Sequence, residues 1–336
     1  MKNYILIGLA LLCGTMTNAQ VPQIERDALM ALYNSTDGAN WVDNTNWGSG
    51  NPVSTWFGVV VENIGGTDHV TELNMEFNNL VGTIPSEIGD LSEINRLVFW
   101  SNELTGTIPP ELGNCLKMKL ISLEENSLSG SIPLSFANWS ELEALWLNDN
   151  YLSGDITNIY ESFPNLNYLG IYNLPQITGE LDLSACSNFL RLFGWNTGLS
   201  TVDVRNGNNA NEFSLINVTD SPNLTCIFVD DKNNIPANWQ KDPTATYVET
   251  QAECDALSIE EFNSSNFNLY PNPTNKSFFI DSRILIEKVS IYDIFGKLVR
   301  IFPSQNGYDV TGLSYGMYLV NIQSEGGIAI QKLMIE

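Results

Sequence analysis

The chain has 336 residues, of which 43% are hydrophobic, and its 39 acidic residues outnumber 15 basic ones, giving a formal net charge of −24 at pH 7. Nucleic acid is not expected as a partner, because affinity for it comes mainly from Lys and Arg side chains that neutralise phosphates. The single histidine, His69, excludes a zinc site built from several histidines, and the absence of a Gly-Lys-Ser/Thr loop argues against nucleotide chemistry.

Residues 1–19 have the features of a secretory signal peptide. Lys2 supplies a positive start, an apolar stretch runs from Ile5 to Cys13, and Ala19 ends a small-residue cleavage site. The apolar stretch is too short to cross a bilayer, and no other segment is apolar enough to do so. We therefore expect an exported protein without a transmembrane segment.

Residues 20–68 are predicted to form an N-terminal cap for the structure that follows. Ala28, Leu29 and Leu32 recur at helical spacing. Each tryptophan of this segment can bury ~150–250 Å², so these side chains can cover an open core. Stacking on a carbohydrate is the functional alternative. The tryptophans concerned are Trp41, Trp47 and Trp56.

Residues 69–229 contain a repeat of 24 residues. A fixed period in this range predicts a solenoid, in which each short strand buries its apolar side against the neighbouring units. One asparagine per unit is expected to turn inward and to bond backbone groups of adjacent turns. The pattern is regular to about residue 200 and degenerate after it. The repeat asparagines are Asn78, Asn102, Asn126 and Asn150.

The frame around Asn102 resembles the plant-type leucine-rich repeat. Leu97 and Phe99 precede the asparagine, and Gly106 and Pro109 follow it in the Gly-x-Ile-Pro element of that subclass. The resemblance implies a mainly β, right-handed horseshoe. Parallel strands would line its concave face, and short helical or 3₁₀ segments would lie outside.

Residues between the buried positions of each strand should point outward on the concave face. They include large aromatics beside carboxylates, a combination that suits recognition of a ligand. Aromatics also suit exposed parallel strands in the absence of any ligand. The candidate ligand-binding residues are Glu72, Glu76, Phe77, Trp100, Glu124, Trp146, Tyr168, Tyr172, Phe193 and Trp195.

Glu76 and Glu124 raise the alternative of a glycoside hydrolase. They stand two units apart, ~10 Å by strand spacing, which is near the upper range for an inverting pair. The surface is expected to be open rather than a cleft, and nothing obvious in the sequence would raise the pKa of either carboxyl group. We therefore assign no catalytic residue and expect a protein that is not an enzyme.

Residues 230–255 are predicted to form a C-terminal cap, with Trp239 as cover for the core. Cys226 and Cys254 flank this segment, and a disulfide between them is expected in an exported protein. Residues 256–266 form a polar linker.

Residues 267–336 consist of short alternating runs separated by glycines, which predicts a small β-sandwich. The acidic excess lies before them, because residues 20–265 hold eight basic and 33 acidic residues. The sequence from Asp293 to Lys297 and an opening Tyr-Pro-Asn-Pro motif resemble the type A C-terminal sorting domain of the Bacteroidetes type IX secretion system. The resemblance implies export across the outer membrane, removal of this domain, and release of the cargo or its attachment to surface lipopolysaccharide. The opening motif is Tyr270, Pro271, Asn272 and Pro273.

The sequence thus predicts a secreted or cell-surface binding protein that passes through the periplasm and recognises a protein or peptide on its concave face. A glycan-binding adhesin is the alternative, and a glycoside hydrolase is less favoured. No cofactor is expected. No metal site is expected either, because the oxygen-rich positions lack the ligand spacing of a calcium loop. These positions are Asp149, Asp155, Asp230 and Asp231.

Overall fold

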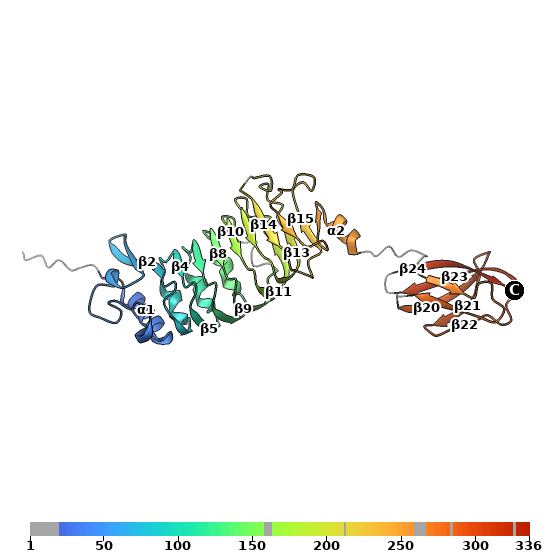
Figure 1. Cartoon of the computed structure of the whole chain (residues 1–336), viewed down its shortest axis with the longest axis horizontal. Coiled ribbons are helices and arrows are strands. Elements are labelled where there is room, and N and C mark those ends of the chain that lie inside the picture. Colours follow the sequence, from blue (N-terminus) through green and yellow to red (C-terminus); the bar gives the residue numbers. More distant parts are fainter. Residues whose placement is uncertain (1–19, 158–162, 212, 259–266, 283–284, 325–326) are drawn as a thin grey trace, which may run out of the picture. The chain divides into compact units, whose positions relative to one another are not determined.

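Figure 1 shows the chain as a computed structural model, which describes residues 20–157, 163–211, 213–258, 267–282, 285–324 and 327–336. The chain forms two compact units, Met1–Gln251 and Ala252–Glu336. The signal peptide expected at 1–19 and most of the linker expected at 256–266 lie outside the described residues. Within the described part of the chain, no helix has the length and apolar character that crossing a bilayer requires.

The first unit begins with a cap built around helix α1 (Gln23–Ser35), in which Ala28, Leu29 and Leu32 are buried. Trp47 packs between Trp41 and Trp56, with ring centroids 4.9 and 5.0 Å away. All three indoles are buried, so they cover the end of the core and leave no open face for a carbohydrate. Two short 3₁₀ turns complete the cap: η1 (Gly38–Asn40) and η2 (Val53–Thr55).

A buried carboxylate joins the cap to the first coil. Glu25 in α1 is 1% exposed, and its Oε1 lies 2.5 Å from Nδ1 of His69. Its Oε2 accepts the Val70 N–H at 2.8 Å. Because both carboxylate oxygens have partners, the cost of burying the charge is offset. The single histidine of the chain is therefore a structural contact.

A nine-stranded sheet, the first sheet, runs along this unit (Figure 1). Its first two strands pair antiparallel, and all later neighbours pair in parallel with equivalent positions opposed, as Glu72 opposes Arg96 and Arg96 opposes Leu120. The strands are short because in most coils only three residues, centred on one buried apolar residue, adopt the extended strand conformation. They are β1 (Val59–Ile64), β2 (Thr67–Asn74), β4 (Arg96–Val98), β6 (Leu120–Ser122), β8 (Ala144–Trp146), β10 (Tyr168–Gly170), β12 (Arg191–Phe193), β14 (Leu215–Val218) and β16 (Gln240–Lys241).

The return side of the coils forms a second parallel sheet of eight strands, which the repeat pattern did not predict. The expected 3₁₀ segments are present on this side, and the second sheet is added to them because the segment after each asparagine pairs with its copy in the next coil, as Thr105 does with Ser127. The 3₁₀ turns η3 (Ser86–Asp90), η4 (Pro110–Asn114) and η5 (Leu134–Asn138) begin after the Ile-Pro steps. The strands are β3 (Val81–Thr83), β5 (Glu103–Thr107), β7 (Ser127–Gly130), β9 (Tyr151–Asp155), β11 (Leu174–Asp182), β13 (Thr197–Asp203), β15 (Cys226–Phe228) and β17 (Thr246–Val248).

The repeat asparagines hold neighbouring coils together. Asn126 accepts the Leu104 N–H of the preceding coil at 3.0 Å and donates to the carbonyls of Phe99 at 3.0 Å and Leu123 at 3.1 Å. One amide thus serves backbone groups that the strand-to-strand turn would leave unpaired. The other repeat asparagines also bond to backbone groups of adjacent segments: Asn78, Asn102 and Asn150.

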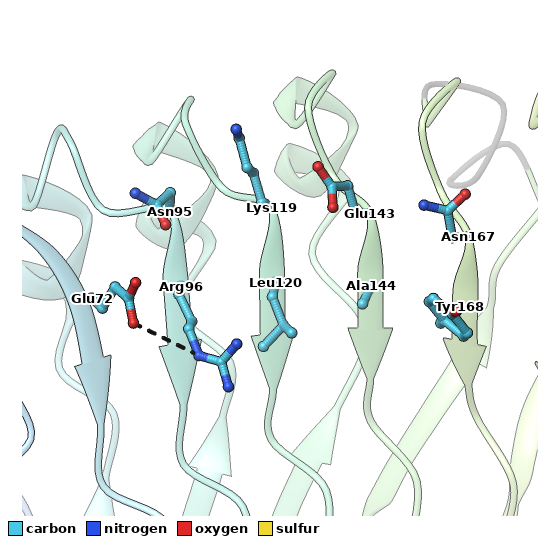
Figure 2. A pocket seen from close by; sticks show the side chains of 9 residues that line it. All are labelled: Glu72, Asn95, Arg96, Lys119, Leu120, Glu143, Ala144, Asn167 and Tyr168. Atoms are coloured by element: carbon cyan, nitrogen blue, oxygen red, sulfur yellow. Dashed lines mark ion pairs between the residues drawn. The ribbon is translucent and has the colours of Figure 1, made fainter. Parts of the chain in front are cut away.

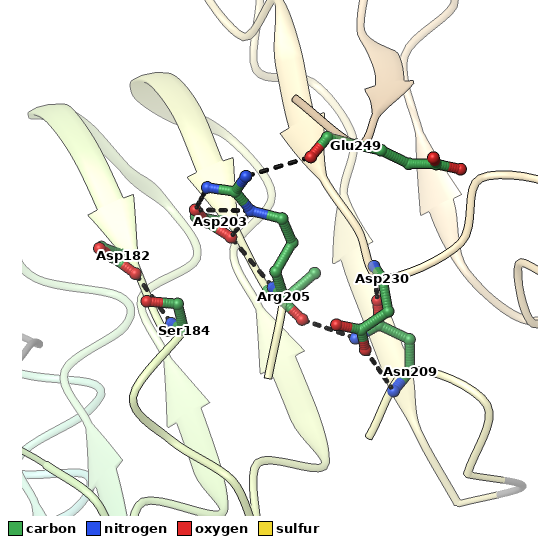
Figure 3. Close-up of polar contacts among 8 residues, drawn as sticks. Asp182, Ser184, Asp203, Arg205, Asn209, Asp230 and Glu249 are labelled. Atoms are coloured by element: carbon green, nitrogen blue, oxygen red, sulfur yellow. Dashed lines mark hydrogen bonds and ion pairs between the residues drawn. The ribbon is translucent and has the colours of Figure 1, made fainter. Parts of the chain in front are cut away.

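The stack continues beyond residue 229, because β16 and β17 extend the two sheets as far as Val248. Arg205 ties these last coils together (Figure 3). Its guanidinium is paired with the Asp203 carboxylate, donates to the Glu249 carbonyl at 3.1 Å and lies 4.8 Å from the ring centroid of Phe228. A planar guanidinium can bond and stack at once, which suits this junction.

The four cysteines among the described residues fall into two pairs, one oxidised and one reduced. Cys226 and Cys254 are disulfide-bonded, and Cys254 lies in helix α2 (Gln251–Ser258). Cys115 and Cys186 are free and buried, and burial raises the pKa of each thiol to about 12. Because the thiolate is the reactive form, these two side chains are suited to packing rather than to chemistry.

The second unit consists of two antiparallel sheets around one core, as the alternating runs predict. Inward positions from both sheets, such as Phe278, Val289 and Val320, are fully buried. The smaller sheet contains β18 (Phe267–Tyr270), β19 (Ser277–Ser282) and β22 (Tyr308–Asp309). The larger sheet contains β21 (Leu298–Pro303), β20 (Ile286–Asp293), β23 (Gly316–Ser324) and β24 (Gly327–Ile335).

Asn272 of the opening motif pairs with β24, the last strand of the larger sheet. Its Oδ1 accepts the Met334 N–H at 2.9 Å, and its Nδ2 donates to the Lys332 carbonyl at 2.7 Å. The Thr274 N–H continues the pairing by donating to the Met334 carbonyl at 2.9 Å. The motif therefore satisfies backbone groups that an edge strand would otherwise expose.

Candidate functional site

The candidate site is the solvent-facing surface of the first sheet, which we call the strand face. The residues two places before each repeat asparagine, together with Tyr172 and Trp195 at the equivalent places of the two less regular coils, form one row across it. Backbone hydrogen bonds join each coil to the next at this place. The Phe77 N–H donates to the Trp100 carbonyl at 3.1 Å, and the Asp149 N–H donates to the Tyr172 carbonyl at 3.2 Å. Successive members are one strand spacing, ~4.8 Å, apart. The row contains Glu76, Trp100, Glu124, Asn148, Tyr172 and Trp195.

A left-handed turn follows each member of the row. The residue after it has φ of 53° or 54°, whatever its type, and Asp220 of the next coil has φ of 55°. Bulky residues resist this conformation, so Phe77 is held there by the two sheets of the coil. The repeated turn directs equivalent side chains the same way. The residues concerned are Phe77, Ser101, Glu125, Asp149, Asn173, Asn196 and Asp220.

The aromatic side chains form two groups. In the first, Phe77 and Trp100 meet edge to face, with ring centroids 4.5 Å apart. In the second, Tyr172 stacks on Trp195 at 3.8 Å and 10°, Trp146 lies 5.6 Å from Phe193, and Phe193 meets the edge of Trp195 at 6.2 Å. Each ring of the second group keeps part of its surface in solvent. We call these sets the Trp100 group (Phe77 and Trp100) and the Trp146 group (Trp146, Tyr172, Phe193 and Trp195).

Gly170 makes the Trp146 group possible. It stands opposite Trp146 on one side and Phe193 on the other in the parallel register. A β-carbon at Gly170 would lie 2.4 Å from Cε3 of Trp146 and 2.9 Å from Oδ1 of Asn148. The indole therefore occupies space that any other residue would fill.

An acidic stretch, consisting of Glu124, Glu125 and Asp149, lies between the two aromatic groups. Glu124 accepts a hydrogen bond from the Ser122 hydroxyl at 2.8 Å. Burial is the main cause that raises the pKa of Glu124, and the charges of Glu125 and Asp149 raise it further. Burial, together with the charge of Asp149, also raises the pKa of Tyr172 to about 12, so the phenol stays protonated beside the Asp149 carboxylate.

Asn148 lies in the middle of this surface with an incomplete set of hydrogen bonds. Its side chain is 1% exposed, and its Nδ2 donates to Oδ2 of Asp149 at 2.8 Å. Its Oδ1 is buried and accepts no hydrogen bond from the described residues. A buried carbonyl oxygen without a donor costs about 1–3 kcal/mol, so this atom is suited to accept a donor from outside the chain.

A second region of the strand face is a pocket of about 310 Å³ at the start of the strands (Figure 2). Arg96 Nε lies 3.9 Å from Oε2 of Glu72, and both side chains are partly exposed. Arg191 lies over the Tyr168 ring at 5.8 Å, outside the pocket lining. The lining residues are Glu72, Asn95, Arg96, Lys119, Leu120, Glu143, Ala144, Asn167 and Tyr168.

The structure thus distributes the ten candidate residues over several places on the strand face. Six belong to the two aromatic groups and Glu124 to the acidic stretch, whereas Glu72 and Tyr168 line the pocket and Glu76 is an exposed member of the row. The pKa of Glu124 is raised, mainly by burial, which nothing obvious in the sequence indicated. Asn148 and Gly170 are not among the candidate residues taken from the sequence, and a short polar residue or a glycine among aromatics is the signal for both.

The comparisons with known families agree with the two units. Residues 268–336 match the family described as a secretion system C-terminal sorting domain, and residues 69–91 match the leucine rich repeat family. The chain therefore contains a leucine-rich repeat and a type IX secretion sorting domain. That domain indicates export through the type IX system to the cell surface or the extracellular space. No curated protein matches the chain.

Solved structures similar to this chain include three ectodomains from Arabidopsis thaliana. That of the receptor kinase SOBIR1 is 27% identical, with 51% of this chain and 91% of that chain covered and a TM-score of 0.43. The BIR2 ectodomain is 27% identical, with 48% and 84% covered and a TM-score of 0.42. The ectodomain of GASSHO1/SCHENGEN3, solved in complex with CASPARIAN STRIP INTEGRITY FACTOR 2, is 21% identical, with 67% and 29% covered and a TM-score of 0.49.

Proposed function

We propose that the repeat unit recognises a protein or peptide ligand on the strand face after export. The observation that carries this proposal is the Trp146 group, four adjoining aromatic side chains that stay partly in solvent beside an acidic stretch. Exposed aromatic clusters of this kind mark interaction sites, because aromatic anchors supply most of the binding energy in protein interfaces.

The ring packing favours a protein ligand over a glycan. Tyr172 and Trp195 stack on each other, so one face of each ring is already covered. A sugar needs an open ring face for stacking, whereas a protein side chain can use ring edges and the neighbouring carboxylates. The acidic stretch adds charge that would attract a basic partner and would be screened by salt.

A retention assay tests this proposal. The purified protein, immobilised, is exposed to extracts of host cells, of neighbouring bacteria and of polysaccharide at low and at high salt. We expect a protein or peptide to be retained at low salt and lost at high salt, and Trp100→Ala and Trp146→Ala to reduce retention at least tenfold.

Tyr151→Ala is the matched control, because Tyr151 is 70% exposed on the second sheet. Unchanged retention by the two tryptophan variants, with an intact fold, would contradict the proposal. Salt-insensitive retention of polysaccharide would favour the adhesin.

We also propose that passage through the periplasm is followed by removal of the sorting domain, with release or surface attachment of the repeat unit. Deletion of residues 267–336 should leave the protein inside the cell, whereas the full chain should be found outside in shortened form. Cell fractionation and mass spectrometry of the exported form measure both outcomes. Normal export of the truncated chain would contradict the role given to this domain.

A further inference from the structure

The acidic stretch of the strand face has no cation of its own. The ion pairs of the described residues join other side chains, and none includes Glu124, Glu125 or Asp149. Both carboxylate oxygens of Asp149 already accept hydrogen bonds, one from Asn148 and one from Asn173. Glu124 has one hydroxyl donor, from Ser122, and Glu125 is exposed. The carboxylates of Glu124 and Glu125, which lie on one coil, can therefore each accept further hydrogen bonds from a ligand.

The buried Oδ1 of Asn148 is a second and independent sign of a ligand donor. Glu124 and Asn148 are adjacent members of the row, since the Glu125 N–H donates to the Asn148 carbonyl at 3.1 Å. The unpartnered Oδ1 and the edge of the Trp146 indole meet above Gly170. A donor can reach that oxygen if the indole moves aside, and the indole face then lies next to the donor.

Resting on the function proposed above, we infer that this surface is a subsite for an arginine side chain of the protein or peptide ligand. The guanidinium would pair with Glu124 and Glu125, donate to Oδ1 of Asn148 and place its plane against Trp146. Arginine fits better than lysine because its five N–H donors lie in one plane, which serves several acceptors and stacks on an aromatic face at once. Trp100, on the other side of Glu124 in the row, closes the acidic stretch with a second aromatic surface.

Calorimetric titration of the purified full-length protein tests the inference. The probes are three glycine–serine nonapeptides that differ only at the central residue, which is arginine, lysine or citrulline. Citrulline keeps the shape of arginine and removes its charge. We expect the arginine peptide to bind, the lysine peptide to bind at least threefold more weakly and the citrulline peptide at least tenfold more weakly.

Two variants locate the effect. Glu124→Gln should weaken binding of the arginine peptide at least fivefold, and Asn148→Leu, which removes the acceptor but keeps the volume, at least threefold. Glu87→Gln is the control, because Glu87 is an exposed carboxylate in η3. Equal binding of the arginine and citrulline peptides, no binding of any peptide, or no effect of Glu124→Gln would overturn the inference. If any of these results occurred while Trp146→Ala still lost ligand in the retention assay, the arginine subsite would be wrong. The proposed function would stand.

Discussion

The indole of Trp146 lies across the backbone of Gly170, with only 2.4 Å between its Cε3 and the place a β-carbon of Gly170 would take. Because the two residues are opposed in the parallel register, the missing side chain in β10 lets Trp146 approach Phe193 in β12. One glycine thus links aromatic residues that belong to coils two apart. The Trp146 group depends on this position as much as on its rings.

Gly170→Ala should therefore displace Trp146 and destabilise the repeat unit by about 1–3 kcal/mol, the usual cost of overpacking a close contact. Tryptophan fluorescence during urea unfolding measures this unit alone, because all eight tryptophans lie before residue 240. Gly50→Ala is the control, since nothing lies within 4 Å of a β-carbon there. If Gly170→Ala unfolds like the original chain, Trp146 does not occupy this space in solution.

The asparagine rows make a second prediction. Asn126→Ala removes the acceptor of the Leu104 N–H and the donor to the Phe99 and Leu123 carbonyls, and it should lower the free energy of unfolding by about 3 kcal/mol. Asn114→Ala, at an exposed residue, should change it by less than about 0.5 kcal/mol. Equal effects of the two variants in the same fluorescence assay would show that the inward amide does not hold the coils together.

The repeat frame was predictable because a strict period leaves one way to bury the apolar side of each strand. Leu97, Phe99 and Asn102 identify their own places from spacing alone. The second sheet was not predictable in this way, since segments such as 103–107 are polar and reveal themselves as strands only when their copies stack in register. The contact of Trp146 with Gly170 is likewise a property of two coils, and neither sequence segment carries it alone.

The sorting domain gives a third prediction, centred on Asn272. Asn272→Ala should free the Met334 N–H and the Lys332 carbonyl of β24, at a cost of about 1–2 kcal/mol in the stability of the second unit. Hydrogen exchange of the Met334 amide should accelerate about tenfold. Asn268→Ala, at an exposed position of β18, is the matched control. Unaltered exchange at Met334 would show that the motif does not protect this strand.

The raised pKa of Glu124 makes the stability of the repeat unit depend on pH. In the native state Glu124 keeps its proton to a higher pH than in the unfolded chain, where the ordinary value is 4.5. Between these two pKa values the native state binds more protons than the unfolded state, so this group lowers stability as pH rises through that window. Glu124→Gln cannot ionise and retains an oxygen for the Ser122 hydroxyl. We therefore expect this variant to melt about 1–3 °C above the original chain at pH 7 and at about the same temperature near pH 4.

Thermal melting followed by tryptophan fluorescence at a series of pH values measures this difference. Glu87→Gln removes an exposed carboxylate of the same unit and corrects for the change in net charge. A gain in Glu124→Gln that persists unchanged at pH 4 would mean that ionisation of this carboxyl is not its cause. A bound arginine peptide should act in the opposite direction, because a cation beside Glu124 favours the ionised form and lowers its pKa. With the peptide in excess at pH 7, the melting temperature of the original chain should therefore no longer lie below that of Glu124→Gln, since only the carboxylate gains a charged partner.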